Sequence, residues 1–461
     1  MPACGFPLPD HGSWLCACPT SLDPPGRGPY SLFMKIPPVK GTRDFYPPLM
    51  AVRNYITDGW KAVSRRNGFE EYDGPILEHL QMYTIKSGDE IVEQLFSLQD
   101  RGGRDLAIRP EITPTLARMV SQQVHALPRP IKWFSVPRLC RAERPQKGRL
   151  REFFQWNIDI LGVDDVVADA EIIFCALDYL QEVGLTARDV VARISSRRML
   201  AEVLLALGVA EDRLQALYVV LDKKGKVLPE TFDQMLAEQV PQAALQARIR
   251  QLMAAQTIDE VAQMASSDKA QQAIQDVRRL FDTLTAMGVA DLCAFDIGIV
   301  RGLAYYTGVV FELFDRTSQL RAIGGGGRYD NLLAQFGGPQ LTATGMGMGD
   351  CVLGILLEEK GLLKDRVQPL SLDYFVAAAD PHYLPKTLEI AARLRRMGVP
   401  AGFAYRPMSL GKQLKAASEQ RARRCIIVGD EIHQGHLAVK DLSTGTQELV
   451  AVDRLLSDVA R

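Results

Sequence analysis

The sequence predicts an α+β protein with an antiparallel sheet at its core, a helical insertion within that core and a small α/β domain at its C-terminal end. Between about residues 41 and 162, strand-like segments do not alternate regularly with helices, which argues against a doubly wound parallel sheet. Residues 195–290 are rich in Ala, Leu, Gln, Met and Arg at helical spacing. After residue 370, strand-like and helical segments alternate.

Length and composition agree with this organisation. At roughly 150 residues per domain, 461 residues suggest about three domains. Apolar residues make up 47%, charged residues 24% and the net charge is -1, a globular composition that neither predicts nor excludes a nucleic-acid partner. No apolar run is long enough to cross a membrane, and the eight cysteines form no CxxC pair. We therefore expect a cytoplasmic protein in a reducing compartment, with no membrane partner.

The domains follow in chain order. Residues 1–33, rich in Pro, Gly, Cys and Ser, are expected to form a disordered leader, with zinc binding by its cysteines as the alternative. Residues 34–194 and 291–366 should form the core domain, which begins with an amphipathic helix over 51–67, and residues 195–290 the insertion. After a linker at 367–370, the domain at 370–461 should contain strands and helices at 372–379, 384–397, 399–404, 410–421 (capped by Ser409) and 425–428.

The clearest strand pattern lies at residues 153–160. Alternation places one polar-rich set on one face and Trp156, Ile158 and Ile160 on the other. The polar-rich set is Phe153, Gln155, Asn157 and Asp159. That face either lines a polar site or is simply solvated.

A basic loop precedes this strand. Residues 141–151 carry five cationic side chains around a Pro/Gly turn between two strand-like runs. Arginines in such a hairpin can give a polyphosphate bidentate, charge-assisted contacts. A solvated basic loop is the alternative.

Two glycine-rich stretches lie further along the chain. The four glycines of 324–327 indicate a backbone that approaches a ligand closely, whereas residues 345–349, Gly-Met-Gly-Met-Gly, could instead reflect helix packing. Neither is a dinucleotide-binding GxGxxG after a strand, and GxxxxGK[ST] is absent from the sequence. Rossmann and P-loop sites are therefore disfavoured.

Over residues 34–461 the chain resembles the histidyl-tRNA synthetases, a family of class II aminoacyl-tRNA synthetases. The resemblance rests on five motifs that occur together and in order, at residues 40–47, 109–113, 141–159, 301–308 and 324–330. It implies a ligase that activates histidine with ATP to histidyl-adenylate and transfers the histidyl group to tRNA(His). It also implies a homodimer, with Gly74-Pro75 at the two-fold interface.

The resemblance also implies the residues of the histidine site. Four of them would hold the amino group and the imidazole ring, because an ammonium and a ring N–H both need acceptors: Glu111, Thr113, Gln155 and Asp159. Tyr305 and Tyr306 would close the pocket, which Ile112, Arg141 and Arg301 complete. A pocket that pairs both imidazole nitrogens rejects other amino acids, so editing should be unnecessary.

For ATP, the resemblance gives four contacts. Arg141 would hold the α-phosphate, Glu143 the adenine amino group, Phe153 the adenine ring by stacking, and Arg149 the γ-phosphate. Arg301 would be the second α-phosphate arginine, so Arg141 and Arg301 are the expected catalytic residues. Mg²⁺ would bridge the distal phosphates. Its protein ligands are left open, with Glu312 as a candidate ligand or merely a sheet residue.

Two departures from the family pattern keep alternatives open. Family motif 3 usually carries a Gly-Leu-Glu-Arg run, but residues 349–352 are Gly-Asp-Cys-Val, and Ala304 replaces a usual aspartate. A non-catalytic paralogue, such as the regulatory subunit of ATP phosphoribosyltransferase, is therefore one alternative, and an RNA- or protein-binding regulator on a synthetase fold is another. The C-terminal module argues against the first, because it resembles the family's anticodon-binding domain. A basic cluster there suits RNA backbone contact or is a solvated helix face: Lys412, Lys415, Arg421, Arg423 and Arg424.

Overall fold

The computed structural model describes residues 36–84, 94–300, 305–317, 319–364, 366–367 and 371–459. The predicted leader at 1–33 and most of the predicted linker at 367–370 lie outside this part of the chain. The chain divides into two compact units, with the boundary after Lys364. Within the described ranges, no helix combines the length and the apolar character that crossing a membrane would require.

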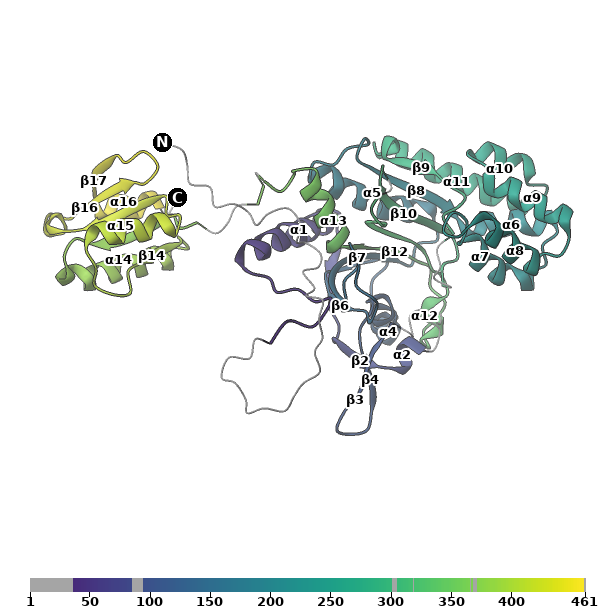
Figure 1. Cartoon of the computed structure of the whole chain (residues 1–461), viewed down its shortest axis with the longest axis horizontal. Helices are drawn as coiled ribbons and strands as arrows, with labels where there is room; N and C mark the ends of the chain where they lie inside the picture. The colour runs from purple at the N-terminus through teal and green to yellow at the C-terminus, as the bar shows by residue number, and fades with distance from the viewer. Residues whose placement is uncertain are drawn as a thin grey trace. The chain divides into compact units, whose positions relative to one another are not determined.

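The first unit is built on a nine-stranded sheet, in the order β1-β5-β7-β12-β11-β10-β8-β9, with β6 paired to β7. Among these strands, Figure 1 labels β6, β7, β8, β9, β10 and β12. All its pairings are antiparallel except the two at the edges, β1 with β5 and β8 with β9. The predicted α+β class with an antiparallel sheet is confirmed. The strands are β1 (Glu70–Glu71), β5 (Ile131–Ser135), β6 (Arg138–Cys140), β7 (Glu152–Leu161), β8 (Val190–Ser196), β9 (Cys293–Phe295), β10 (Val309–Asp315), β11 (Gly324–Arg328) and β12 (Ala343–Gly349).

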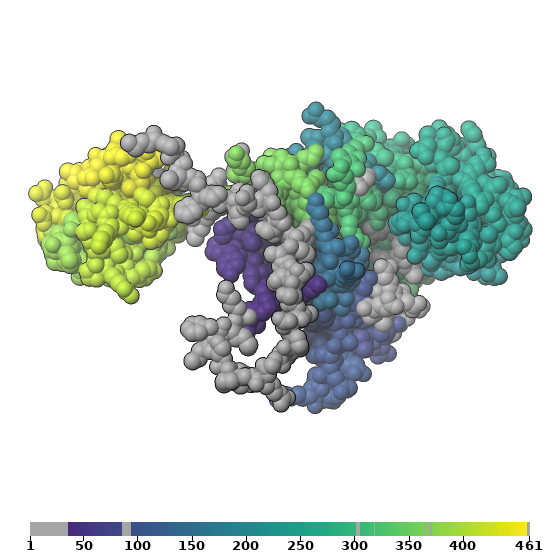
Figure 2. Space-filling view, viewed as in Figure 1, coloured from purple at the N-terminus to yellow at the C-terminus, as the bar shows by residue number. Residues whose placement is uncertain are grey.

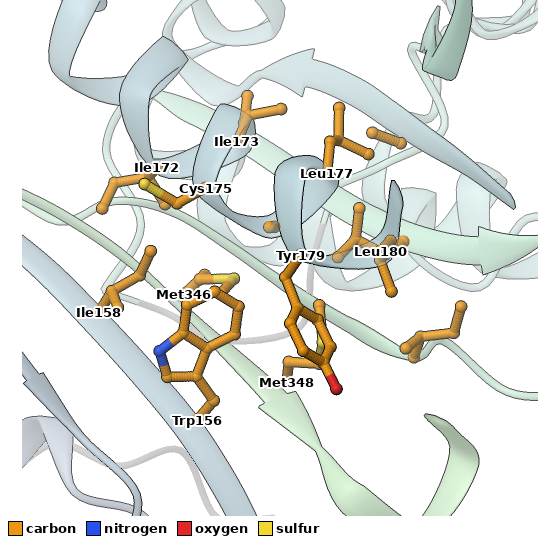
Figure 3. Packing of buried hydrophobic residues seen from close by; sticks show 14 of the residues in the cluster. Trp156, Ile158, Ile172, Ile173, Cys175, Leu177, Tyr179, Leu180, Met346 and Met348 are labelled. Atoms are coloured by element: carbon orange, nitrogen blue, oxygen red, sulfur yellow. The ribbon is translucent and has the colours of Figure 1, made fainter. Parts of the chain in front are cut away.

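One face of this sheet is covered by helices. α5 (Val166–Glu182), α1 (Pro47–Arg66) and α13 (Asp350–Glu359) bury the main hydrophobic core between themselves and the sheet. Alternation along β7 sends Trp156 and Ile158 into this core, where they meet Met346 and Met348 of β12 beneath α5 (Figure 3). The Trp156 indole donates to the Ser64 hydroxyl of α1 at 2.8 Å, so its polar atom is satisfied inside the core. The opposite face of the same strands is left for the site.

Between β8 and β9 the chain forms a helical module with a hydrophobic core of its own. In the space-filling view its residues, coloured teal, gather in one region of the first unit (Figure 2). α11 packs against both α5 and α6, and so joins the module to the rest of the first unit. These helices fall within the predicted insertion at 195–290, although its limits as a separate domain stay a prediction. They are α6 (Arg197–Leu207), α7 (Leu214–Leu221), α8 (Pro229–Gln239), α9 (Ala243–Ala254), α10 (Ile258–Met264) and α11 (Asp268–Ala286).

A smaller subassembly borders the site. β2 (Leu77–His79), β4 (Asp105–Ile108) and β3 (Phe96–Gln99) form a three-stranded antiparallel sheet. α4 (Thr113–Gln123) follows β4, and the short helices α2 (Gln81–Thr84) and α12 (Leu332–Gln335) complete this region. The turn from β4 into α4 carries Glu111, Ile112 and Thr113 of the predicted site.

The second unit is a small α/β domain, as predicted. Its sheet has the order β14-β13-β15-β16-β17, parallel over the first three strands and antiparallel over the rest. The predicted strands and helices all occur, within two residues of their expected ends, but Ser409 makes no side-chain hydrogen bond at the start of its helix. The elements are β13 (Tyr374–Ala378), α14 (Leu384–Arg396), β14 (Ala401–Phe403), α15 (Leu410–Glu419), β15 (Arg424–Val428), β16 (His436–Asp441), β17 (Gln447–Ala451) and α16 (Val452–Val459).

Candidate functional site

The polar face of β7 forms the floor of the candidate site. Asn157 and Asp159 are buried, and Gln155 is half-buried. The predicted alternation is confirmed, and the alternative of a solvated sheet face is wrong for Asn157 and Asp159. Burying these polar groups costs free energy unless each forms a hydrogen bond with the protein or with a bound ligand.

The two glycine-rich stretches are neighbouring strands beside this floor. Gly345 pairs with Asp159, and a Cβ at Gly345 would lie 2.0 Å from the Asp159 Oδ1 atom. A Cβ at Gly347 would lie 2.9 Å from the Gln155 Cδ atom. The helix-packing interpretation of residues 345–349 is wrong: they form β12, and absent side chains make room for the polar residues of β7.

Asp159 is the most deeply buried acid of the floor, at 2% exposure. The Tyr329 hydroxyl donates to its Oδ1, whereas Oδ2 is buried without a hydrogen-bond partner in the described part of the chain. Burial raises the pKa of Asp159 to about 7, against a lowering contribution from the Tyr329 hydrogen bond. The Tyr72 hydroxyl is also buried and unpartnered among the described residues, and burial raises its pKa, with the Asp159 charge adding to the shift.

Glu111 lies in the turn between β4 and α4. Its side chain is buried, and its Oε1 has no hydrogen-bond partner within the described ranges. Burial raises the pKa of Glu111, and the nearby Arg141 guanidinium opposes that shift. Arg141 is held in place by its Nε, which donates to the Pro110 carbonyl at 3.1 Å. Ile112 is fully buried in an apolar cluster, and Thr113 begins α4.

The two tyrosines expected to close the pocket lie together. The ring centroids of Tyr305 and Tyr306 are 4.9 Å apart, and Tyr305 meets the Tyr329 ring edge-on at 5.9 Å. Tyr306 packs in the same apolar cluster as Ile112. The structure therefore brings both tyrosines to the residue that hydrogen-bonds Asp159. Arg301 lies outside the described residues.

The basic loop, residues 141–151, joins β6 to β7 as a hairpin. Phe153 lies on β7 beside it, with the Arg141 Cζ atom 5.2 Å from its ring centroid. Glu143 and Arg149 form an ion pair with each other. The resemblance assigns these two residues to opposite ends of ATP, so this pair must open if both are to contact the nucleotide.

The basic loop is hydrogen-bonded to the segment around Gly41 and lies beside Val352 of motif 3. The Arg151 backbone N–H donates to Gly41 O at 2.8 Å, and its Nε donates to Glu143 O at 3.0 Å. At the loop's tip, Gly148 has φ +74°, and a Cβ there would lie 2.9 Å from Val352 Cγ2. Val352 therefore occupies the space beside the loop at the position where the family usually carries an arginine.

Asp350, which also differs from the usual motif 3 run, has a clear structural role. Its side chain is only 4% exposed, and Oδ2 accepts from the Arg43 Nη2 at 2.6 Å. Oδ1 accepts from the backbone N–H of Phe154 at 3.0 Å. This carboxylate thus joins the first sequence motif, the start of α13 and β7, and sequence reasoning did not identify it.

Metal binding has limited support from side chains alone. Among the residues that the structure describes, no group of three or more His, Cys, Asp or Glu side chains could hold an ion. Glu312 is half-buried on β10 and alternates with Phe311, so it lies on the sheet face opposite the main core. A single carboxylate fits Mg²⁺ only where substrate phosphates and water supply the other ligands.

Two tyrosines of the site were missed as individual residues. Tyr72 follows β1, and Tyr329 follows β11, 170 positions from its partner Asp159. Neither has a local sequence signal for its role, because each contact depends on the pairing of distant strands. Contacts join the expected residues in two groups: Arg141 lies near both Glu111 and Phe153, and Asp159 is linked through Tyr329 to Tyr305 and Tyr306.

Comparison with known proteins gives two family matches. The sequence model described as histidyl-tRNA synthetase matches residues 41–349, and the one described as anticodon binding domain matches residues 373–461. Together they cover both compact units.

Individual relatives agree with these matches. The chain is 40% identical over 412 residues to the histidine–tRNA ligase of Opitutus terrae, which covers 88% of this chain and 94% of the relative. It is 39% identical over 420 residues to the chloroplastic/mitochondrial histidine–tRNA ligase of Arabidopsis thaliana, covering 91% and 85%. In fold, it resembles the crystal structure of histidyl-tRNA synthetase from Nostoc, with a TM-score of 0.76 and 22% identity over 93% of this chain and 99% of that one.

Proposed function

The chain belongs to the histidyl-tRNA synthetase family, and on that premise we propose that it activates histidine with ATP and transfers the histidyl group to tRNA(His). The observation that carries this proposal is the pair of buried acceptors, Glu111 Oε1 and Asp159 Oδ2. Each lacks a hydrogen-bond partner among the described residues. An α-ammonium group and an imidazole N–H are donors of the kind that such acceptors need.

The reaction uses positioning and charge rather than a side-chain base. The histidine carboxylate oxygen attacks the α-phosphorus of ATP, the bond to the bridging oxygen breaks, and pyrophosphate leaves. Arg141 and Arg301 are proposed to stabilise the negative charge that gathers on the α-phosphoryl oxygens. The Pro110 carbonyl and the Phe153 ring support this role for Arg141, because they orient its guanidinium beside Glu111.

The nucleotide is proposed to stack on Phe153, with Glu143 at the adenine amino group and Arg149 at the γ-phosphate. ATP phosphates would compete with Glu143 for Arg149, so nucleotide binding should separate this ion pair. Mg²⁺, when bound, would neutralise part of the charge on the distal phosphates, with Glu312 as the candidate protein ligand.

The second unit is proposed to hold the tRNA. Its match to the anticodon binding domain supports this role, and so do the exposed lysines Lys412 and Lys415 on α15. The match also counts against a regulatory subunit without a tRNA partner. The homodimer, with Gly74-Pro75 at its two-fold interface, and the cytoplasmic location stay predictions.

An aminoacylation assay tests the proposal directly. The protein should charge tRNA(His) with histidine and should catalyse pyrophosphate exchange that depends on histidine. Arg141→Ala should lower the exchange rate by about 100-fold or more, as does the loss of one oriented transition-state donor. Arg188→Ala is the control, because Arg188 is an exposed arginine before β8 and outside the basic loop, and it should change the rate less than about threefold. If calorimetry found histidine binding but no ATP binding at millimolar concentration, the ligase proposal would fall.

A further inference from the structure

Arg197 is a buried arginine at the junction between the main sheet and the helical module. It is the first residue of α6, directly after β8, and only 4% of it is exposed. Its backbone N–H donates to Gly308 O at 2.8 Å. Its Nε donates to Val300 O at 3.1 Å, and its Nη1 donates to Tyr306 O at 3.2 Å. One residue therefore binds the backbone on both sides of the segment 301–304.

These partners link Arg197 to the histidine pocket. Tyr306 packs against Tyr305, and Tyr305 packs against Tyr329, whose hydroxyl donates to Asp159. A planar guanidinium suits this position, because it can donate to two carbonyls at once in a fixed geometry. A lysine ammonium could keep the charge without that fixed orientation.

The guanidinium also faces the helical module. Its Cζ lies 4.9 Å from the ring centroid of Tyr218 on α7, which is a cation–π contact. Burial raises the pKa of the Tyr218 hydroxyl, and the Arg197 charge opposes that shift. Val300, the carbonyl partner, belongs to the hydrophobic core of the module. The Arg197 side chain therefore contacts both the helical module, through Tyr218, and the pocket tyrosines, through the Tyr306 backbone.

We infer that Arg197 is a positioning residue for histidine binding, and that Tyr218 makes the helical module contribute to histidine affinity. Arg197 acts through the backbone of Tyr306 and does not touch the substrate. The inference rests on the proposed function, because it takes the pocket beside these tyrosines as the histidine site.

The test compares Arg197→Gln with Arg198→Gln in the full-length protein. Arg198 is adjacent in sequence, but its side chain is 60% exposed and pairs only loosely with Asp276 at 3.4 Å. Arg197→Gln should raise the Kd for histidine, measured by calorimetry, and the KM for histidine in pyrophosphate exchange by about tenfold or more. The KM for ATP should change less than about threefold, and Arg198→Gln should leave all three constants near wild type.

Two further variants separate positioning from general stability. Arg197→Lys should recover part of the histidine affinity, because it retains a donor and the charge. Tyr218→Leu should raise the histidine Kd by about two- to fivefold, and should add little once Arg197 is already Gln. Equal rises in the KM for histidine and the KM for ATP, or a lower melting temperature with unchanged histidine affinity, would overturn the inference.

If Arg197→Gln does not yield folded protein, Tyr218→Leu decides the matter, and an unchanged histidine Kd in that variant refutes the inference. Failure of the proposed function would look different. Wild-type protein would then bind histidine without catalysing pyrophosphate exchange, and the calorimetric comparison of variants could still be made. Wild-type protein that binds no histidine would overturn both.

Discussion

Replacing Asp159 by Asn should make the protein more stable at alkaline pH and much weaker in binding histidine. The carboxylate is 2% exposed, and one of its oxygens has only the Tyr329 hydroxyl as a donor. Its other oxygen has no partner in the described part of the chain. An isosteric amide keeps the acceptor for Tyr329 but removes the buried negative charge.

The size of the effect follows from the pKa. Burial raises the Asp159 pKa from the ordinary value of 3.8 to about 7. The folded protein therefore binds this proton more tightly than the unfolded chain does, and the free energy of unfolding falls as pH rises between about 4 and 7. Between pH 5 and pH 8, ionisation of Asp159 should lower the free energy of unfolding of the wild type by about 3 kcal/mol. Asp159→Asn lacks this ionisable group, so its free energy of unfolding should show no such loss. The destabilisation is complete above pH 7 and absent below pH 4.

The measurement is thermal unfolding of the first unit at pH 5 and pH 8, with histidine affinity measured at pH 8. Asp159→Asn should gain stability relative to wild type as pH rises, while its Kd for histidine increases about 10- to 100-fold through loss of a charge-assisted contact. Asp164→Asn, an exposed position three residues after β7, is the matched control and should do neither. A stability difference that does not vary with pH would refute the burial argument. Unchanged histidine affinity would remove Asp159 from the pocket.

Three other predictions concern packing around the site. Gly345→Ala should raise the KM for histidine far more than Gly347→Ala does. At Gly345 the new Cβ would meet a buried carboxylate and backbone, whereas at Gly347 it would meet only a side-chain amide that can rotate. Equal rises in the KM for histidine, measured by pyrophosphate exchange, would contradict this. Arg43→Ala should lower the free energy of unfolding by about 2 to 4 kcal/mol, because its carboxylate partner would stay buried and unpaired; a melting temperature equal to that of wild type would show that the pair is dispensable. Val352→Arg should not raise the exchange rate, because the tip of the basic loop fills the adjoining space, and a marked gain in rate would disprove that view.

The fold could be predicted where side chains alternate in chemical character. Period 2 along residues 153–160 identified β7 and its two faces, and helical spacing identified the module between β8 and β9. The glycine strands could not be assigned in the same way. Residues 324–327 have no side chains to alternate, and Gly-Met-Gly-Met-Gly fits a strand and a packed helix equally well. Only their pairing with β7 and β10 reveals what they leave room for.

The candidate site was predictable as a set of residues but not as a network. Motifs gave the acceptors of the pocket, since Glu111 and Asp159 lie in segments with recognisable chemistry. Tyr72 and Arg197 were not found, because the groups that act on them are distant in sequence: the Asp159 charge for the first, and the backbone carbonyls of Val300 and Tyr306 for the second. Such contacts arise from sheet order and helix packing, which local patterns do not specify.

The altered motif 3 is best understood as a local rearrangement of contacts. Asp350 is bound by Arg43 and by the Phe154 backbone, so the start of α13 is tied to β7 through a buried carboxylate. Val352 turns an apolar side chain toward Gly148. An arginine at 352 would need that same space, whereas the guanidinium of Arg141 already reaches the Phe153 ring from the opposite strand of the hairpin. Loss of the motif 3 arginine therefore leaves the aromatic surface and the adjoining positive charge in place, and it does not by itself argue for a non-catalytic protein.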